Sequence, residues 1–337
     1  MTATFELPAG LEAAAPPADR AAVRLLVARP GAIEHARFPD LGAFLAPGDL
    51  LVVNTSGTLA AAVDGTRQDG RAVTVHFATP LDDGTWVVEV RPAHGAAGPV
   101  PDSRAGDVIT LPGDVRVGLA RPHPGGQIRL WQATAAVAGG VLAYLERHGR
   151  PIRYAYVPRP VPLADYQTVF ARQPGSAEMP SAGRPFTAEI VTDLVTRGIG
   201  IVPITLHTGV SSQDAGEPPQ PERYAVPPAT ARAVNLTRAG GGRVVAVGTT
   251  ATRALESAAD RTGTVRGQAG WTDLVLGPGR PARVVTGLIT GWHAPGASHL
   301  DLLAAVAGAE LVDRAYQEAV RDRYRWHEFG DSCLLLP

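Results

Sequence analysis

The stretch Arg243-Val-Val-Ala-Val-Gly-Thr-Thr-Ala-Thr-Arg-Ala-Leu-Glu-Ser257 places a run of small and β-branched apolar residues directly before a helical pattern. This order predicts a buried strand that turns at a glycine into a helix opened by threonines. Free amides at such a helix start favour an anion, and open α/β sheets bind ligands at the carboxyl ends of their strands. Thr249, Thr250 and Arg253 are therefore candidate ligand-binding residues, the alternative being an ordinary helix cap with a surface arginine.

Strands and helical patterns also alternate on either side of this stretch, which predicts an α/β fold with a mostly parallel sheet. Between residues 59 and 149 the pattern changes to short β-branched segments separated by Gly, Pro or Asp, typical of an all-β module. We therefore expect a discontinuous α/β domain, residues 1–58 and 150–337, with a small barrel-like β domain, residues 59–149, inserted into it. The patterns predict helices at 137–148, 187–198, 228–239 and 249–259, strands at 48–53, 199–206 and 243–248, and a loop at 208–222.

The composition excludes several classes of protein. The chain has 337 residues, with 31 basic residues against 32 acidic ones, so it is neither a strongly basic nucleic-acid coat nor a polybasic membrane binder. Its single cysteine, Cys333, can form neither an intrachain disulfide nor a cysteine-based zinc site. No apolar run approaches the roughly 18 residues of a membrane span, and Met1–Gly10 lacks the pattern of a secretory signal. We expect a cytoplasmic protein with no membrane partner, and nothing in the sequence specifies an oligomeric state.

Two histidines follow apolar runs that predict strands. His293 comes directly after Trp292, so a ring for stacking a heterocycle stands beside a group that can move a proton near neutral pH. The alternative is a buried tryptophan packed beside a satisfied histidine. His207 ends the run Ile201–His207, where it is either a strand-end catalytic group or a turn cap. No HxH or HExxH spacing occurs, so we expect no metal.

A third candidate is the loop Gly175-Ser-Ala-Glu-Met-Pro-Ser-Ala-Gly183, whose amides and Ser181 are suited to line a pocket. The patterns GxGxxG, the phosphate-binding P-loop and GxSxG are all absent from the sequence. Their absence weighs against a dinucleotide-binding dehydrogenase, a P-loop NTPase and an α/β-hydrolase.

An ordered set of short motifs runs nearly from end to end of the chain. Together these motifs resemble the S-adenosylmethionine:tRNA ribosyltransferase-isomerase family of the queuosine pathway, and the predicted barrel lies where that family has one. The motifs are Phe5-Glu-Leu-Pro8, Gly48-Asp-Leu-Leu-Val-Val-Asn-Thr55, Tyr166-Gln-Thr-Val-Phe170, Pro180-Ser-Ala-Gly183, Thr205-Leu-His207, Glu222-Arg-Tyr224, Val244–Ser257, His293 with Pro295, Tyr324-Arg325 and Gly330-Asp331.

The resemblance implies an enzyme with S-adenosylmethionine as co-substrate and ribosyl donor, no metal, and tRNA bearing 7-aminomethyl-7-deazaguanine as acceptor. In the family the ribosyl part rearranges to an epoxycyclopentanediol while adenine and methionine leave. The sulfonium acidifies the 5′ carbon, so a base must remove a proton there, and an arginine should hold the methionine carboxylate.

The resemblance also implies roles for particular residues. His207 or His293 is expected to carry the proton, with Asp331 as an orienting group or a second carboxylate. Thr249, Thr250 and Arg253 are expected around the polar end of the donor, and Trp292 against a purine face. The further substrate-binding residues that it implies are Asn54, Thr55, Tyr166, Gln167, Pro180, Ser181, Ala182, Gly183, Tyr324 and Arg325.

Several loops depart from the family pattern. Ser56 stands where the family has Arg, and Glu178-Met-Pro-Ser-Ala-Gly-Arg-Pro-Phe186 stands where it reads Ala-Ala-Pro-Thr-Ala-Gly-Leu-His-Phe, so that Pro185 replaces a histidine. Tyr324-Arg-Trp-His-Glu-Phe-Gly-Asp-Ser-Cys333 replaces Tyr-Arg-Phe-Phe-Ser-Tyr-Gly-Asp-Ala-Met. The chain is therefore either a divergent tRNA enzyme or a paralogue that cleaves or rearranges S-adenosylmethionine with a small acceptor or alone. A non-catalytic RNA-binding protein is the third alternative.

Overall fold

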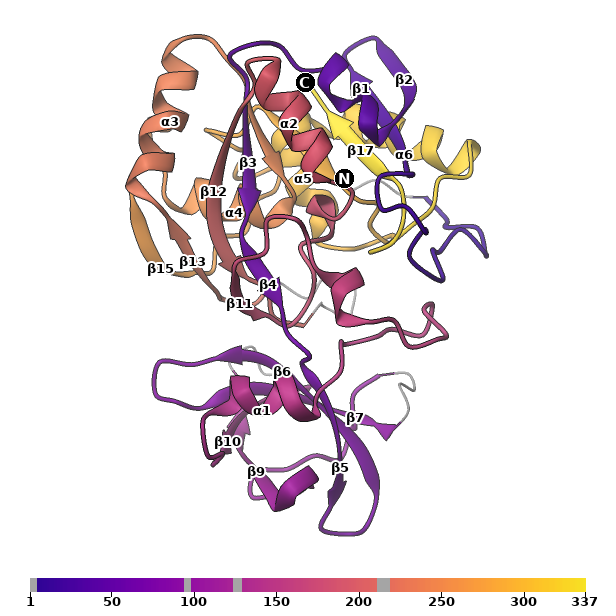
Figure 1. The fold of residues 1–337 in the computed structure, drawn as a ribbon, viewed down its shortest axis with the longest axis vertical. Helices are drawn as coiled ribbons and strands as arrows, with labels where there is room; N and C mark the ends of the chain where they lie inside the picture. Colours follow the sequence, from indigo (N-terminus) through magenta and orange to yellow (C-terminus); the bar gives the residue numbers. More distant parts are fainter. Residues whose placement is uncertain (1–4, 94–97, 124–128, 211–218) are drawn as a thin grey trace.

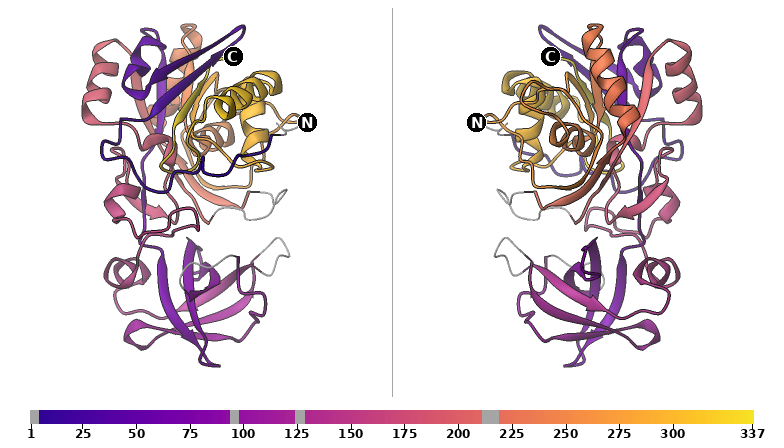
Figure 2. Two further views of the ribbon diagram at one scale, coloured as in Figure 1. Left: turned by 90° about the vertical axis from the view of Figure 1, so that its right-hand side faces the viewer. Right: turned by 90° about the vertical axis from the view of Figure 1, so that its left-hand side faces the viewer.

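The computed structural model describes residues 5–93, 98–123, 129–210 and 219–337. Figure 1 shows a layered α/β part and, below it, a separate barrel that the chain enters once and leaves once. Both parts recur in the side views of Figure 2, where the barrel lies at one end of the long axis. The predicted fold class, an α/β sheet with an inserted barrel, is confirmed.

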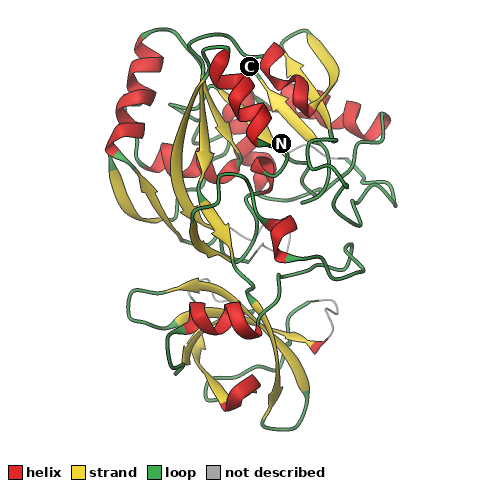
Figure 3. Ribbon diagram, in the orientation of Figure 1, coloured by secondary structure: helices red, strands yellow, loops and turns green. Residues whose placement is uncertain are grey.

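The described residues of the α/β part form one large mixed sheet (Figure 3) and a small parallel pair, β11 (Gln173–Ser176) with β4 (Ser56–Thr58). Four adjacent strands, β12, β3, β14 and β16, run parallel, as do β17 and β1, whereas the remaining neighbours are antiparallel. In spatial order the strands are β15 (Gln268–Thr272), β13 (Glu222–Val226), β12 (Gly200–His207), β3 (Leu50–Asn54), β14 (Val244–Val247), β16 (Gly287–Thr290), β17 (Ser332–Leu335), β1 (Arg24–Arg29) and β2 (Ala32–Arg37).

The central strand β3 shows why the parallel strands consist of consecutive apolar residues in the sequence. Leu50 and Val52 pack into a core on one face of the sheet, and Leu51 and Val53 into a second core on the other. A strand covered on both faces needs apolar residues at every position. The predicted strands at 48–53, 199–206 and 243–248 are therefore found, as β3, β12 and β14.

Helices cover both faces of the sheet. Residues of α3, α4, α5 and α6 belong to the first core, and those of η1 and α2 to the second. No helix of the described ranges is both long and apolar enough to cross a membrane. The helices are α1 (Val141–His148), α2 (Ala188–Thr196), α3 (Pro228–Ala239), α4 (Thr249–Ser257), α5 (His299–Ala307) and α6 (Ala309–Arg321), with short 3-10 turns that include η1 (Phe38–Ala43), η4 (Leu163–Tyr166) and η5 (Ser181–Gly183).

Two predicted elements have different limits. The helix expected at 137–148 begins only at Val141, because Gly139 and Gly140 have φ values of 80° and 86°, which an α-helix does not use. The loop expected at 208–222 ends in β13, a short strand next to the edge strand β15 with no long apolar run to reveal it, and residues 211–218 lie outside the described residues.

The barrel is closed, and its interior forms an apolar core of its own. The two chain segments that join it to the sheet pair with each other, since the backbones of Ala62 and Arg150 exchange hydrogen bonds of 2.9 Å in both directions. Gly149 is required there because a Cβ would lie 1.9 Å from the carbonyl oxygen of Ala60. In spatial order the barrel strands are β10 (Leu130–Ala135), β7 (Trp86–Pro92), β6 (Ala72–Pro80), β5 (Ala62–Arg67), β8 (Val108–Leu111) and β9 (Val115–Pro122).

Candidate functional site

A cavity of about 1090 Å³ lies between the barrel and the carboxyl ends of the parallel strands. Thr208, Gly248 and Thr290, at the ends of β12, β14 and β16, line it from the sheet, and Arg91 and Arg129 line it from the barrel. Carboxyl ends of parallel strands are where α/β sheets bind ligands. The volume exceeds the several hundred Å³ that one drug-sized ligand needs, so a nucleoside donor and an acceptor base can share it.

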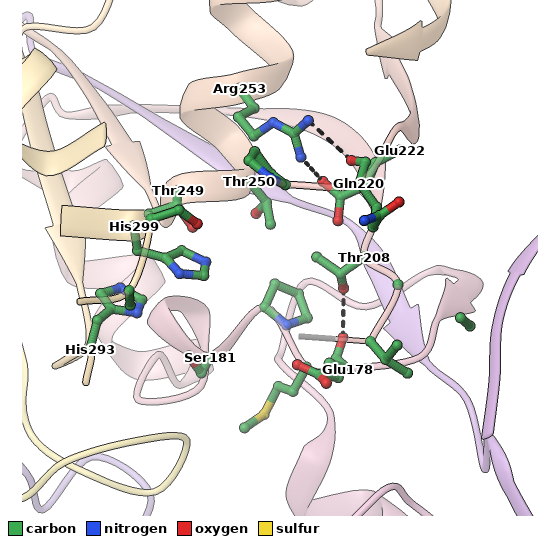
Figure 4. Close-up of a pocket in the computed structure, with 18 of the residues that line it drawn as sticks. Glu178, Ser181, Thr208, Gln220, Glu222, Thr249, Thr250, Arg253, His293 and His299 are labelled. Carbon is green, nitrogen blue, oxygen red and sulfur yellow. Dashed lines mark hydrogen bonds and ion pairs between the residues drawn. The ribbon is translucent and has the colours of Figure 1, made fainter. Parts of the chain in front are cut away.

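Histidine 293 and histidine 299 form one side of this cavity (Figure 4). Their rings stack almost in parallel, with centroids 4.4 Å apart and an interplanar angle of 2°. Burial lowers the pKa of His293 well below its ordinary value, with the charges of His299 and His327 adding to the effect. Burial, and then the charge of Arg253, lowers the pKa of His299 to about 4. Both rings are therefore neutral at pH 7.

The hydrogen bonds around His293 select its tautomer. The hydroxyl of Thr290 donates to the Gly291 carbonyl at 3.0 Å, so toward His293 Nε2, also at 3.0 Å, it acts as acceptor. Nε2 then carries the proton, and the lone pair lies on Nδ1, which no described residue hydrogen-bonds. The backbone of His293 is fixed as well, because its N–H donates to Tyr316 and its carbonyl accepts from Trp326. The arrangement holds a neutral base in place.

Trp292 lines the cavity but belongs to the core. It is 1% exposed, and it packs against Tyr316, Tyr324 and Trp326 with centroids 4.9, 5.6 and 5.3 Å away. Of the two interpretations of Trp292, its surroundings therefore match the buried tryptophan packed beside a hydrogen-bonded histidine. Its Nε1–H has no hydrogen-bond partner among the described residues.

A buried ion pair forms another side of the cavity. Arg253, on α4, contacts the carboxylate of Glu222, and its remaining donors reach the carbonyls of Leu274, Gln220 and Thr272 at 3.1 to 3.3 Å. Burial raises the pKa of Glu222 to about 7, against the opposing charge of Arg253. The guanidinium is thus fixed by the protein, with its charge paired to Glu222, and offers no free fork to a ligand.

The start of α4 lies between the histidines and this ion pair in Figure 4. Gly248 has a φ of 95°, and this left-handed turn directs the chain from β14 into the helix. Thr249 and Thr250 occupy the first turn, and the Thr250 hydroxyl accepts from Asn54 Nδ2 at 3.2 Å. A helix start facing a cavity favours a negative group. Pro180, Ser181 and Ala182, from the loop that precedes α2, line the cavity next to it.

Two carboxylates, each bonded to a tyrosine, form the acidic wall: Glu178 with Tyr154, and Glu328 with Tyr156. Burial, more than any charge, raises the pKa of Glu328 to about 7. Tyr156 also stacks on His327 at 4.2 Å. The acidic wall brings together segments that are far apart in the sequence.

His207 does not line the cavity. It ends β12, and its Nδ1 lies 2.7 Å from the hydroxyl of Ser56, which is 2.6 Å from that of Ser176. Its ring packs directly on Gly175, where a Cβ would come within 2.4 Å of Nδ1. Burial lowers its pKa below the ordinary value. The structure therefore places His207 in a buried serine network beside the site.

Other predicted residues also lie outside the lining. Asp331 accepts from the side chain and backbone of Arg24 and from the backbone of Arg325, so it ties the chain before β17 to β1. Gln167 bonds both backbone groups of Thr58 and so holds β4 (Ser56–Thr58). The remaining residues outside the lining are Asn54, Thr55, Tyr166, Gly183, Tyr324 and Arg325.

The departures from the family pattern fall in two places. Pro185 and Arg184 are buried and line no part of the cavity. Arg184 stacks over Phe329 at 5.6 Å, and its Nε and Nη2 have no partner in the part of the chain that the structure describes. Burial lowers the pKa of Arg184 to about 10. Glu178 and Glu328, by contrast, face the cavity.

A cluster with metal-ligand spacing lies elsewhere, on the surface. His35 Nε2 lies 3.0 Å from Glu318 and 3.4 Å from Asp322. Arg321 pairs with both carboxylates, so the cluster already contains a cation.

The sequence matches the family model described as Queuosine biosynthesis protein over residues 2–335. The chain belongs to this family. It is 39% identical to the S-adenosylmethionine:tRNA ribosyltransferase-isomerase of Symbiobacterium thermophilum, over 98% of each chain. It is 37% identical to the protein of that name in Acidiphilium cryptum, over 98% of this chain and 97% of the relative. A crystal structure of the S-adenosylmethionine tRNA ribosyltransferase of Thermotoga maritima matches with a TM-score of 0.55 and 29% identity, over 98% and 99% of the two chains.

Membership of the queuosine family confirms the resemblance, and the structure adds cavity residues that sequence reasoning missed. His299 and Glu222 line the cavity, and neither was assigned to it from the sequence, although Glu222 lies in the motif Glu222-Arg-Tyr224. Glu178 and Glu328 also line it. Their signal was present, since each is an acidic residue at a position where the family pattern has a small neutral one.

Proposed function

We propose that this chain is an S-adenosylmethionine-dependent tRNA ribosyltransferase-isomerase. It transfers and isomerises the ribosyl group of S-adenosylmethionine onto 7-aminomethyl-7-deazaguanine in tRNA, and it releases adenine and methionine. The observation that carries the proposal is the cavity at the strand ends, in a chain that matches the family from residue 2 to 335. One side of this cavity holds a neutral histidine, and another holds a buried arginine at a helix start.

His293 is the proposed base. Its Nδ1 accepts the proton from the 5′ carbon beside the sulfonium, because the Thr290 bond leaves the lone pair on that nitrogen. Its low pKa keeps the ring unprotonated at neutral pH, and burial removes water that would compete for the proton. His299, stacked on it, excludes solvent from the other face of the ring.

The start of α4 is the proposed site of the donor's polar end. Its free amides and the hydroxyls of Thr249 and Thr250 suit the methionine carboxylate. Arg253 keeps this end of α4 in a fixed position, because Glu222 and three carbonyls hold its guanidinium. Ser181 lines the cavity beside this helix start and is a further donor contact in the proposal.

The remaining predicted roles follow from this arrangement. We assign Asp331, His207 and the other predicted residues outside the lining to holding the strand ends in place. Residues 59–149 form the barrel domain, and residues 1–58 and 150–337 form the α/β domain. The reaction takes place in the cavity between the two domains. A tRNA acceptor places the enzyme in the cytoplasm.

The direct test is to incubate the purified protein with S-adenosylmethionine, with and without tRNA that carries 7-aminomethyl-7-deazaguanine. Chromatography then follows adenine and methionine. Release that depends on the modified tRNA is the expected result. Release without tRNA would replace the proposal with a paralogue acting on a small acceptor or on the donor alone. Salt-dependent tRNA binding without any release would indicate a non-catalytic RNA-binding protein.

A further inference from the structure

The acidic wall of the cavity is built from two carboxylates and two stacked tyrosines. Tyr154 donates to Glu178, and Tyr156 donates to Glu328 Oε1 at 2.7 Å. The two tyrosine rings stack 5.9 Å apart, and Tyr156 stacks in turn on His327 at 4.2 Å. The stacked rings hold both carboxylates at fixed positions in the cavity lining.

One carboxylate oxygen of Glu328 remains able to accept a hydrogen bond. Its Oε2 is buried and has no hydrogen-bond partner among the described residues. The barrel shows the opposite case, because Glu89 is paired with both Arg91 and Arg129. An unfilled buried carboxylate oxygen is costly unless a donor reaches it, so a ligand with N–H groups gains from binding there.

Both glutamates add a carboxylate to the same cavity, and the Glu178 charge contributes, after burial, to the high pKa of Glu328. A cationic ligand group relieves this repulsion between like charges. Aromatic rings beside the carboxylates further favour a cation.

We propose that Glu178 and Glu328 bind the cationic, N–H-rich part of the acceptor, the aminomethyl group and donor edge of the deazaguanine base. The inference rests on the proposed function and names the acceptor subsite within it. The acceptor is favoured over the donor because Figure 4 places Glu178 and Arg253 on different sides of the cavity. The helix start beside Arg253 suits the methionine carboxylate, so we assign the polar end of the donor, with its own ammonium group, to that side and the acidic wall to the second substrate.

The consequence is selectivity for charge. This chain should discriminate 7-aminomethyl-7-deazaguanine from its neutral 7-cyano analogue, because only the former carries an ammonium group. Removing the negative charge at either glutamate should reduce that discrimination while the donor site stays intact.

The test compares Glu328→Gln and Glu178→Gln with Glu146→Gln, a matched change on the exposed face of α1 outside the cavity. We expect the KM for modified tRNA to rise about 10- to 100-fold in the first two variants, as for loss of a charge-assisted hydrogen bond. The KM for S-adenosylmethionine should stay within about twofold, and the control should match the wild type. A rise in the donor KM alone, or no change in either, overturns the proposal.

Tyr156→Phe provides a variant that keeps the charge. It removes only the hydroxyl that orients Glu328, so its effect on the acceptor KM should be smaller than that of Glu328→Gln. An equal or larger effect would indicate that the tyrosine, and not the carboxylate, binds the acceptor.

A binding measurement separates this subsite from the proposed activity. Calorimetric titration of the wild-type protein with the free aminomethyl and cyano bases needs no turnover. If no adenine is released but the aminomethyl base binds at least about tenfold more tightly, the reaction is wrong and the subsite stands. If adenine is released but both bases bind equally, the reaction stands and the subsite is wrong.

Discussion

Two histidines at the ends of apolar runs in the same sheet have unlike surroundings. His207 ends β12 inside a network of buried serines and packs on Gly175, whereas His293 follows β16 and lines the cavity with its Nδ1 lone pair available. The sequence signal is the same in both cases, an apolar run that ends in a histidine. What separates a positioning group from a base is the set of hydrogen bonds that other segments bring to the ring.

The sharpest test of this comparison is to replace each histidine by alanine. His293→Ala should lower kcat about 10²- to 10⁴-fold, the usual contribution of a general base. His207→Ala should keep kcat within about tenfold, since its ring contacts the protein and not the cavity. Single-turnover release of adenine measures both. The opposite ranking would transfer the base to His207, and full turnover in both variants would remove histidine from the mechanism.

The fold followed from the sequence where burial on both faces leaves a continuous apolar run. Leu50–Asn54 and Val244–Val247 are such strands, and their pattern alone predicts parallel neighbours. Glu222–Val226 and Gln268–Thr272 gave no such signal, because these strands of five residues at one end of the sheet bury only part of their side chains. Their pairing is set by contacts with distant segments, which no local pattern encodes.

The candidate site was predictable only where one local motif builds it. Thr249, Thr250 and Arg253 share a single strand-to-helix turn, and all three line the cavity. The acidic wall depends on residues 154–156 returning from the barrel to meet Glu328, close to the carboxyl terminus. Such a meeting requires the three-dimensional fold, so spacing along the chain could not reveal it.

The stacked histidines should also make stability depend on pH. The pKa of His299 falls from its ordinary value to about 4, so the unfolded chain binds the proton more readily. The stability that neutral His299 contributes to the folded state is therefore complete above about pH 6.5 and is lost as the pH falls toward 4. Between pH 7.5 and pH 5, His299→Gln should lose about 1–3 kcal/mol less unfolding free energy than the wild type. Urea unfolding of both proteins at the two pH values measures this difference.

The pH dependence of stability that Glu222 and Glu328 contribute has the opposite sign, because burial raises their pKa values to about 7. Their contribution weakens as the pH rises from about 4.5 to 7. The difference between the wild type and His299→Gln therefore removes the two glutamates from the comparison and reports His299 together with its effect on the stacked His293. An unchanged difference at the two pH values would contradict the burial of that ring.

The same stacking should set the acid limb of the reaction. Burial is the main cause of the low pKa of His293, and His299 covers one face of its ring. His299→Ala admits water and moves that pKa up toward the ordinary value, so more of the base is protonated at pH 6. We expect the fall in kcat/KM from pH 8 to pH 6 to be up to about fourfold larger in this variant than in the wild type, because a histidine at its ordinary pKa is about one quarter unprotonated at pH 6. A variant with the wild-type profile would show that other groups keep His293 neutral.

The smallest effect should come from the serine network around His207. Ser56 is 1% exposed, and its hydroxyl contacts both Ser176 and His207, so Ser56→Ala leaves two buried groups short of one partner. The loss of such a bond costs about 1–2 kcal/mol of unfolding free energy. Activity should change less than about threefold, because His207 takes no proton in the reaction. Thr55→Ser, which keeps a hydroxyl on the neighbouring residue, is the matched control. A loss of activity as large as that of His293→Ala, at unchanged stability, would extend the proton path through Ser56 and erase the distinction between the two histidines.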